Sequence, residues 1–577
     1  MSESSSFAQI SERCVRDFLH TIVVVDDRAF QARKQMPVTL TPPGLPAPDG
    51  RSQGADELGA EGVDSAAELV RPEDASPEKE SREEGSADDG DYDLDAEELI
   101  RVFASAGMVC AVLEPKEPGE PGDILPESMP AAKRADALIL DWRIHDNHGE
   151  HALSLIRQVL NADQSHSERL RLILIYTAEP ELKRVFEQLY NDLTSGQKPI
   201  QAVADTAGLV LSNSSLRIAV LAKSNSHLPE QWSNHKVSLR ELPARLVNEF
   251  SQLTSGLISN VALKSLSVLR DQTHTLLAHM GRELDAAYLT HRLLLPNPDD
   301  AIEYACDLVT SEFAALLQSF EVGNVSNAEA VRAWVNRRSE YLLQINTKDA
   351  LEPVKLSVDL VTSLAINGIA SQKTQLKSHI NSSKFDAFHL LSTAMFISNG
   401  ARAEDVDHLF TVASSTVRRY EKNQPAPWLR LGSILKLKVN SSSKRDSQST
   451  HQERYLFCIQ PPCDCVRLRG EPRGFLFVPA HLWDKGTLHC VVRDGDGFRK
   501  LQINVATPEI LRFDPKIDKD LVRSRQDGTE YIFSTETDDY VWIGQLKDMH
   551  AQRLVNQFAA SLARVGLNEY EWARRLR

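Results

Sequence analysis

The first part of the chain alternates between short apolar runs and segments in which apolar residues recur every three or four positions. The runs have the length and continuity of strands that are buried on both faces of a sheet. We therefore predict five strands, at 21–25, 108–114, 135–141, 170–177 and 216–223. The segments between them predict helices at 95–107, 149–161 and 180–193. This alternation indicates an α/β domain over residues 1–240, with a doubly wound parallel sheet covered on both faces.

One long segment interrupts the alternation. Residues 31–93 are rich in Pro, Gly, Ser, Asp and Glu, a composition that cannot bury enough apolar surface to offset the entropy of ordering it. We predict that it is a disordered acidic insertion. Between Asp49 and Glu98 the chain has 19 acidic and four basic residues, nearly the whole of its net charge of −16. The rest of the chain is therefore close to neutral, and no basic bias points to nucleic acid.

The pattern changes twice after residue 240. Between 241 and 428 apolar residues first recur at helical spacing, and we expect a helical region that continues to about 422. The first apolar face consists of Leu242, Leu246, Phe250, Leu253, Leu257, Val261 and Leu266. Between 429 and 577 strand-like runs predict a small antiparallel β module to about 546, followed by a terminal helix at 549–576.

Polar side chains stand at the expected carboxyl ends of the first domain's strands. The first strand ends at Asp26 and Asp27, the third at Asp141, the fourth at Thr177 and the fifth at Lys223. Ligands bind at this edge in open α/β sheets. Neighbouring carboxylates repel each other unless a cation holds them. Their oxygens suit Mg²⁺, which would also neutralise the charge of a phosphoryl group.

These residues resemble the receiver domain of two-component signalling, over roughly residues 15–240. The resemblance rests on the acidic pair in "VVVDDRAF", an acceptor in "LILDWRIHDNHG", a hydroxyl in "IYTAEP" and a lysine in "AVLAKS". Gly149 also falls eight residues after Asp141, as the receiver pattern requires. The resemblance implies a flavodoxin-like fold.

The resemblance also implies a role for each residue. Asp141 would be the phosphoacceptor, taking a phosphoryl group from the phosphohistidine of a partner sensor histidine kinase. Asp26, Asp27 and Asp141, with the backbone carbonyl of Arg143, would hold Mg²⁺. Thr177 and Lys223 would contact the phosphoryl oxygens, the lysine as a point charge.

The sequence departs from the receiver pattern at three places. Ser224 stands where a proline usually follows the lysine, Val220 where an aromatic precedes it, and Ile144-His145 where Met-Pro follows the acceptor. These departures put the common switch in doubt, in which an aromatic follows the hydroxyl residue inward. Arg143 is a bulky cation beside the attack path, and we hypothesise that it alters hydrolysis of the acyl phosphate.

Other candidate sites in the chain are weak. His274 and His279 lie in no recognisable kinase motif, and residues 403–423 favour ordinary helical packing over a DNA-reading helix-turn-helix. Three cysteines gather in "CIQPPCDCVRL", but their spacing lacks the C-x₂-C pairs of zinc sites, which favours a structural role. They are Cys458, Cys463 and Cys465, with His489 and Cys490 downstream.

Three further features predict a cytoplasmic protein. No run reaches the roughly 18 apolar residues of a membrane helix. The N-terminus has no signal-peptide pattern. The seven scattered cysteines are typical of a reducing compartment.

The predicted architecture, together with the motif "CIQPPCDCVRL" in the β module, resembles the receiver proteins of bacterial antiphage defence, and most of all the receiver-only response protein of the Detocs two-component system. That resemblance implies a phosphate sink that competes for phosphoryl groups with a sister response regulator carrying an effector. The sequence contains no P-loop, nucleophile elbow, HExxH or dinucleotide turn. We accordingly expect no enzyme activity beyond the receiver's own phosphorylation.

Several alternatives remain open. Residues 241–577 could themselves be the effector, by binding DNA or a protein, or the β module could be an unrecognised enzyme. The first domain could also be a degenerate receiver that acts as a scaffold, or an α/β domain whose aspartates merely cap helices.

Overall fold

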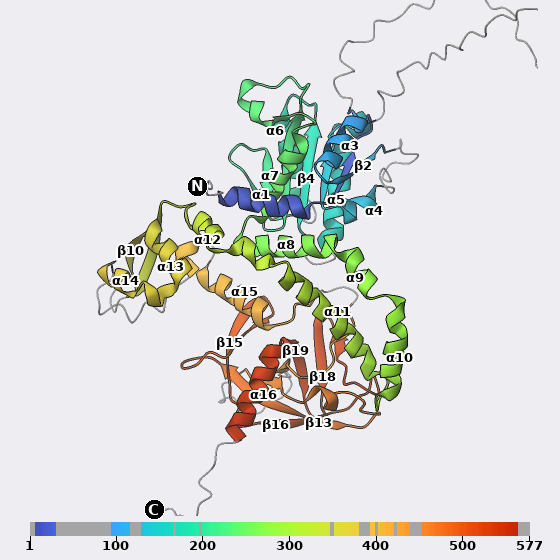
Figure 1. Cartoon of the computed structure of the whole chain (residues 1–577), viewed down its shortest axis with the longest axis vertical. Helices are drawn as coiled ribbons and strands as arrows, with labels where there is room; N and C mark the ends of the chain where they lie inside the picture. The colour runs from blue at the N-terminus through green and yellow to red at the C-terminus, as the bar shows by residue number, and fades with distance from the viewer. Residues whose placement is uncertain are drawn as a thin grey trace, which may run out of the picture. The chain divides into compact units, whose positions relative to one another are not determined.

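The computed structural model describes residues 6–29, 94–115, 128–164, 169–195, 199–346, 351–379, 393–397, 402–419, 424–438 and 453–562. The chain divides into two compact units (Figure 1). One comprises Ala8–Gln164 and Glu168–Val325, and the other Met1–Phe7, Ser165–Ser167 and Ser326–Arg577. The predicted boundaries at 240 and 428 are a finer division and stay predictions. The predicted disordered insertion, 31–93, lies outside the described residues.

The first unit is built on a mostly parallel sheet, as predicted. Its five parallel strands follow the order β2-β1-β3-β4-β7. This order corresponds to that of flavodoxin-like sheets. The strands are β1 (Thr21–Val25), β2 (Val109–Leu113), β3 (Ala137–Leu140), β4 (Arg171–Thr177) and β7 (Leu216–Lys223). Each coincides with a predicted strand to within two residues.

The sheet also has strands that we did not predict. β6 (Val210–Ser212) pairs antiparallel with β7, β5 (Val203–Ala204) pairs antiparallel with β6, and β8 (Lys236–Val237) pairs parallel with the end of β7. Strands of two or three residues are too short for an alternation to show in the sequence. The flavodoxin-like prediction therefore describes the parallel part of the sheet and not its extended edge.

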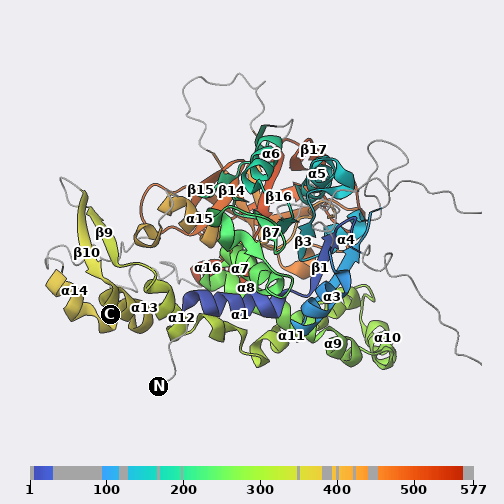
Figure 2. The ribbon, with the colours of Figure 1, turned by 90° about the horizontal axis from the view of Figure 1, so that it is seen from above.

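Helices cover both faces of this sheet (Figure 2). The helices α5 (Glu150–Gln164) and α6 (Leu182–Ser195) pack on one face, against a core that includes Leu138 and Ile173. On the other face α1 (Phe7–Phe18), α3 (Ala96–Ser105) and α7 (Leu242–Thr254) pack against neighbours such as Ile139 and Leu172. Successive strand residues thus point into opposite cores, which explains why the strands read as continuous apolar runs. A short helix, α4 (Met129–Arg134), precedes β3.

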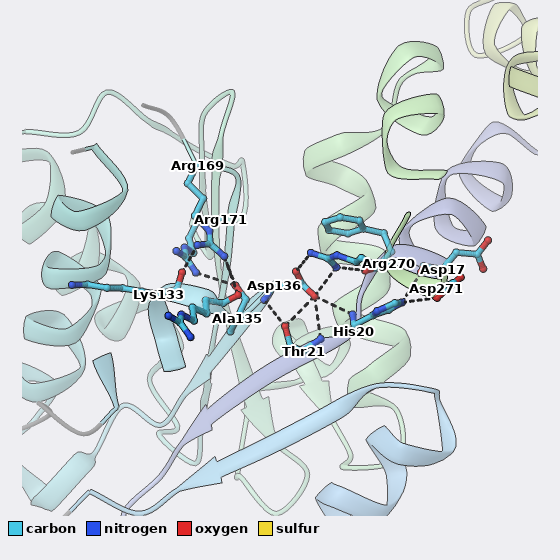
Figure 3. A network of polar contacts seen from close by, with 12 residues as sticks. Asp17, His20, Thr21, Lys133, Ala135, Asp136, Arg169, Arg171, Arg270 and Asp271 are labelled. Atoms are coloured by element: carbon cyan, nitrogen blue, oxygen red, sulfur yellow. Dashed lines mark hydrogen bonds and ion pairs between the residues drawn. The ribbon is translucent and has the colours of Figure 1, made fainter. Parts of the chain in front are cut away.

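A polar network ties a further helix, α8 (Leu257–Asp271), to the amino end of the sheet (Figure 3). Asp136, directly before β3, accepts five hydrogen bonds from His20 N, Thr21 N, Thr21 Oγ1 and two nitrogens of Arg270. Arg270 also donates to the Phe18 carbonyl and lies 4.3 Å over the Phe18 ring. Burial opposes ionisation of Asp136, but these hydrogen bonds outweigh it and lower the pKa of Asp136.

A second network lies beside the first (Figure 3). Arg171, at the start of β4, is fully buried and makes a two-point ion pair with Asp163 of α5, at 2.7 and 2.8 Å. The same guanidinium donates to the carbonyls of Ala132 and Ala135. A buried arginine is tolerated here because its donors meet acceptors of fixed position.

After α8 the first unit continues as helices, as predicted. They are α9 (Thr273–His279), α10 (Asp285–Leu294) and α11 (Asp300–Ser319). The predicted apolar face between Leu242 and Leu266 is split, because α7 ends at Thr254 and α8 begins at Leu257 after Gly256.

The second unit begins with a helix, α12 (Ala328–Val335), and then forms a hairpin that corrects our expectation of helices to about 422. β9 (Glu340–Asn346) pairs antiparallel with β10 (Leu351–Ser357). Tyr341 and Leu356 face each other in this register and are both buried in a small core. Each of these strands is stabilised by pairing with the other, and the spacing of apolar residues within a single strand does not indicate that pairing. The helices α13 (Val358–Ser371), α14 (Lys373–His379) and α15 (Ala403–Ser415) follow.

The predicted antiparallel β module is confirmed as a nine-stranded sheet in the order β14-β15-β13-β12-β11-β19-β18-β17, with β16 beside β13. The strands are β11 (Ser433–Leu437), β12 (Tyr455–Cys458), β13 (Arg473–Leu482), β14 (Cys490–Asp494), β15 (Gly497–Ile503), β16 (Glu509–Phe513), β17 (Arg525–Asp527), β18 (Glu530–Ser534) and β19 (Asp539–Gln545). Cores lie on both sides of the sheet. The helix α16 (Asp548–Leu562) contributes Leu554 to one core, and the rest of the predicted terminal helix lies outside the described residues.

In the part of the chain that the structure describes, no helix has the length and apolar character needed to span a membrane.

Candidate functional site

The candidate site lies at the carboxyl edge of the parallel sheet. Asp26 follows β1, Asp141 follows β3, Thr177 is the last residue of β4, and Lys223 is the last residue of β7. These strands are neighbours in the sheet, so their ends meet at one edge. All four residues are buried, with exposed fractions of 2% for Asp26, 6% for Asp141, 1% for Thr177 and 3% for Lys223.

Lys223 joins two of the carboxylates. Its Nζ lies 3.0 Å from Asp26 Oδ2 and 3.3 Å from Asp141 Oδ1. Each of these charges would be costly to bury alone, and their mutual pairing makes the cluster tolerable. The structure therefore brings together three residues that span almost 200 positions of the sequence.

Backbone N–H groups fix the other carboxylate oxygens. Asp26 Oδ1 accepts from Arg28 N, and Asp141 Oδ2 from Arg143 N, each at 2.9 Å and from two residues further along the chain. Such short loops are typical of aspartates at turns. Asp27 Oδ2 accepts from His145 N, also at 2.9 Å, which links the loop after β1 to the loop after β3.

The pKa values follow from burial and the shared charges. Burial raises the pKa of Asp141 to about 6, and the nearby Asp26 adds to this, while Lys223 opposes it. For Lys223, burial disfavours the charged form, but Asp141 and Asp26 outweigh it and raise the pKa of the ammonium group. At neutral pH Asp141 is therefore mostly ionised and Lys223 is charged, the states that an acceptor and its counter-ion need.

The donor atoms of this site suit a hard divalent cation. Asp27 Oδ1 is buried and has no hydrogen-bond partner among the described residues, and Asp141 Oδ1 is buried with the Lys223 ion pair beside it. With Asp26, they offer the oxygen ligands that Mg²⁺ prefers. Within the described residues, however, no three side chains of His, Cys, Asp or Glu are yet grouped closely enough to hold a metal ion. Metal binding would require these carboxylates to converge further.

Thr177 lies at the same edge, but its hydroxyl is engaged by its own loop. Thr177 Oγ1 accepts a hydrogen bond of 3.2 Å from Glu179 N, and Ser226 Oγ donates to the Thr177 carbonyl.

Sequence reasoning missed Glu179. Its carboxylate forms an ion pair with Arg143 Nε, which joins the loop after β3 to the loop after β4. Glu179 lies two residues after Thr177, just as Arg143 lies two residues after Asp141, and this matching spacing could have indicated the pair.

The sequence analysis singled out His145 only as a departure from the receiver pattern and did not predict its contact with Asp27. It adopts a left-handed backbone conformation with φ of 55°, and its Nδ1 lies 3.8 Å from Asp27 Oδ2. Its ring meets the ring of His151 edge-on, with centroids 5.8 Å apart.

Gly149 has a physical reason to be glycine. Its φ is +96°, and a Cβ at this position would lie 2.2 Å from two ring atoms of Trp142. Trp142 follows the acceptor and is buried, so the glycine lets the start of α5 approach the acceptor loop. Val220, where receivers usually have an aromatic residue, is fully buried in the core. The structure thus keeps the glycine of the receiver pattern at position 149, whereas Val220 stands in place of the usual aromatic residue.

Residues 18–228 match the family model of the response receiver domain. The match includes every site residue from Asp26 to Lys223. It supports a response regulator that takes part in a phosphorelay with a sensor histidine kinase, and receiver domains typically bind Mg²⁺. No curated protein and no solved structure matches the chain significantly.

The other candidate residues lie apart from this site in the sequence. His274 and His279 are exposed on α9. In 403–423, α15 is followed by an extended residue, Thr416, that pairs with Leu546, and residues 420–423 lie outside the described residues. Cys458 and Cys465 are buried in the β module, whereas Cys463 is exposed.

Proposed function

We propose that the protein is a response regulator that accepts a phosphoryl group on Asp141 from the phosphohistidine of a partner sensor histidine kinase. The observation that carries this proposal is the buried cluster of Asp141, Asp26 and Lys223 at the carboxyl edge of the sheet. Helix capping alone needs neither a buried lysine nor a second buried carboxylate there.

The geometry gives each residue a task in the transfer. Asp141 Oδ1, the oxygen that Arg143 N does not hold, attacks phosphorus as the P–N bond of the phosphohistidine breaks and the imidazole leaves. Lys223 faces the same oxygen and balances the charge of the phosphoryl group. The Thr177 hydroxyl, which now accepts a hydrogen bond from Glu179 N, instead donates one to a phosphoryl oxygen.

Mg²⁺, held by Asp26, Asp27, Asp141 and the backbone carbonyl of Arg143, would neutralise phosphoryl charge. This set of ligands remains part of the proposal.

Phosphotransfer from a phosphorylated partner sensor histidine kinase tests the function. Radiolabelled phosphoryl should move from the kinase to the wild-type protein and not to Asp141→Ala. Glu150→Gln, which removes an exposed carboxylate from the start of α5, should accept label at the wild-type rate. Label on Asp141→Ala, or none on the wild type with a competent kinase, would overturn the proposal and favour the scaffold alternative.

We further propose that the protein is a cytoplasmic phosphate sink in phage defence, without enzyme activity beyond its own phosphorylation. This proposal is supported by the resemblance of the predicted architecture to the Detocs receiver-only protein. Adding wild-type protein to the kinase and its sister regulator should lower phosphorylation of the sister. Asp141→Ala should leave it unchanged, and equal competition by both would refute the sink.

A second candidate is a regulator whose 241–577 region is the effector. It is favoured by the compact unit that residues 326–577 form around a nine-stranded sheet. Phosphorylated full-length protein would then bind DNA or a protein. Salt-dependent binding of duplex DNA would support the DNA version.

A further inference from the structure

The β module contains a cluster of three cysteines that the proposed function does not use. Cys458 is the last residue of β12, Cys463 lies on the short turn Pro462–Asp464, and Cys465 follows that turn. Cys458 and Cys465 are fully buried in the same hydrophobic core, whereas Cys463 is exposed. Eight residues of the chain thus contain a buried pair of thiols and one thiol that faces solvent.

The two buried thiols are in contact with each other. The Cys458 thiol forms a hydrogen bond with the Cys465 thiol, which in turn lies 3.3 Å from the carbonyl oxygen of Pro461. Cys458 is fixed by the sheet, because it pairs with Phe477 of β13 and its carbonyl accepts a hydrogen bond of 2.8 Å from Gly432 N. From this contact the two sulfurs need a further approach only to the roughly 2.05 Å of an S–S bond.

Burial protects this pair from direct oxidation. The thiolate and not the thiol reacts with peroxide, and it must be accessible to do so. Burial and the hydrogen bond to Cys465 raise the pKa of the Cys458 thiol well above its ordinary value, so this thiol stays protonated near neutral pH. An oxidant in the solvent therefore meets Cys463 first.

Metal binding does not account for the cluster. Among the residues that the structure describes, no three side chains of His, Cys, Asp or Glu are grouped closely enough to hold a metal ion. Nor do the two downstream candidates join the three cysteines. His489 Nδ1 accepts a hydrogen bond from Ile503 N, and Cys490 packs in the core on the other side of the sheet. Thiol chemistry within the cluster is the remaining possibility for a site.

We propose that Cys463 is a peroxide-sensitive thiol and that its oxidation leads to a disulfide between Cys458 and Cys465. The Cys463 thiolate attacks one oxygen of hydrogen peroxide, the O–O bond breaks, and hydroxide is released as the sulfenic acid forms. The Cys465 thiol attacks the Cys463 sulfur, and the hydroxyl group leaves with the thiol proton as water. Cys458 then attacks the Cys465 sulfur and gives its proton to the departing Cys463, which leaves the disulfide in the core.

The steps require movement of the short turn and not of the sheet. Asp464 N and Cys465 N donate to the carbonyls of Pro461 and Pro462, at 3.0 and 3.1 Å, so these hydrogen bonds are internal to the turn. The Asp464 side chain makes an exposed ion pair with Arg473, which contributes little. In a reducing compartment such a disulfide would be transient, as is typical of redox-sensing cysteines. The proposal goes beyond the proposed function and does not involve the acceptor site.

Peptide mass spectrometry of the full-length protein tests the proposal. The reduced protein is treated with hydrogen peroxide and then unfolded in denaturant that contains N-ethylmaleimide, which alkylates the free thiols. Trypsin releases residues 455–467 as one peptide that contains all three cysteines. In the wild type a disulfide should join Cys458 to Cys465, and the alkyl group should be on Cys463.

Two variants isolate the role of Cys463. Cys463→Ser changes an exposed side chain and should slow formation of the disulfide at least about tenfold. Cys306→Ser removes the exposed cysteine of α11 and should leave the rate unchanged. Dimedone, which traps sulfenic acids, should label Cys463 of the wild type and lower the yield of the disulfide.

Two results would overturn the proposal. An unchanged rate in Cys463→Ser would show that oxidation does not begin at Cys463. Further oxidation of Cys463 to a sulfinic acid, while Cys458 and Cys465 both remain free to be alkylated, would show that the buried pair forms no disulfide.

Discussion

Replacing Asp136 with Asn tests how α8 is held to the parallel sheet of the first unit. Four of the five hydrogen bonds to this carboxylate reach one oxygen, Oδ2, and the fifth reaches Oδ1. In either orientation an amide presents its NH₂ group to donors, and it removes the charge that Arg270 pairs with. Hydrogen bonds to charged groups contribute about 1.5–3 kcal/mol each. Because the Arg270 side chain is 38% exposed, we take about 1.5 kcal/mol for each of its two hydrogen bonds to Asp136 and expect a loss of about 3 kcal/mol.

Hydrogen exchange measured by mass spectrometry is the suitable assay, because two compact units need not unfold in one transition. A loss of about 3 kcal/mol corresponds to roughly a hundredfold faster exchange where local opening governs it. We expect this change in peptides that contain His20 and Thr21. As a control, Asp17→Asn breaks an ion pair with Lys264, which lies on α8 like Arg270. Asp17 is more exposed than Asp136, so this change should alter exchange little.

The effect should also depend on pH. The folded-state pKa of Asp136 is lowered, so its stabilisation is fully present above the ordinary pKa of about 3.9 and is lost as pH falls through the lowered value. The difference between wild type and Asp136→Asn should therefore be constant near neutrality and shrink below about pH 4. Equal exchange in both proteins at neutral pH would refute this account of the network.

Three further predictions concern the site. Arg143→Ala removes a bulky side chain beside the attack path and breaks its ion pair with Glu179, so we expect faster hydrolysis of the acyl phosphate. Loss of label measures its half-life, and equal half-lives in wild type and variant would contradict the hypothesis. In a denaturation assay, Gly149→Ala should lower the stability of the first unit by about 3 kcal/mol, because of the positive φ and the clash with Trp142. Gly208 also has a positive φ but open space around it, so Gly208→Ala should lower the stability by less in the same assay. Lys223→Ala leaves Asp26 and Asp141 buried without their counter-ion, so we expect about 3 kcal/mol lower stability and much slower phosphotransfer. Wild-type rates in that variant would remove Lys223 from the mechanism.

The parallel sheet was predictable because its signal is local. Strands such as β4 are buried on both faces, so their apolar runs are visible in the sequence without knowledge of a partner. The position of the site followed from the same signal, since parallel strands end at one edge. Asp141 and Lys223 could thus be placed near each other without knowing their separation.

What could not be predicted depends on contacts between distant segments. Asp136 and Arg270 are 134 residues apart, and neither lies in a motif. The Arg143–Glu179 pair joins two loops whose approach is set by the packing of β3 against β4. The hairpin of β9 and β10 is stabilised by its cross-strand pairing, and β5, β6 and β8 are too short to show a period.

Mapping of the phosphorylated residue tests the central claim most directly. The protein is incubated with Mg²⁺ and acetyl phosphate, a small phosphoryl donor, and the product is reduced with borohydride, which converts an aspartyl phosphate to homoserine. Peptide mass spectrometry should find homoserine at position 141, and none when borohydride is added without phosphoryl donor. Homoserine at another aspartate, or at none while the kinase transfers no label either, would contradict the assignment of Asp141 as the acceptor.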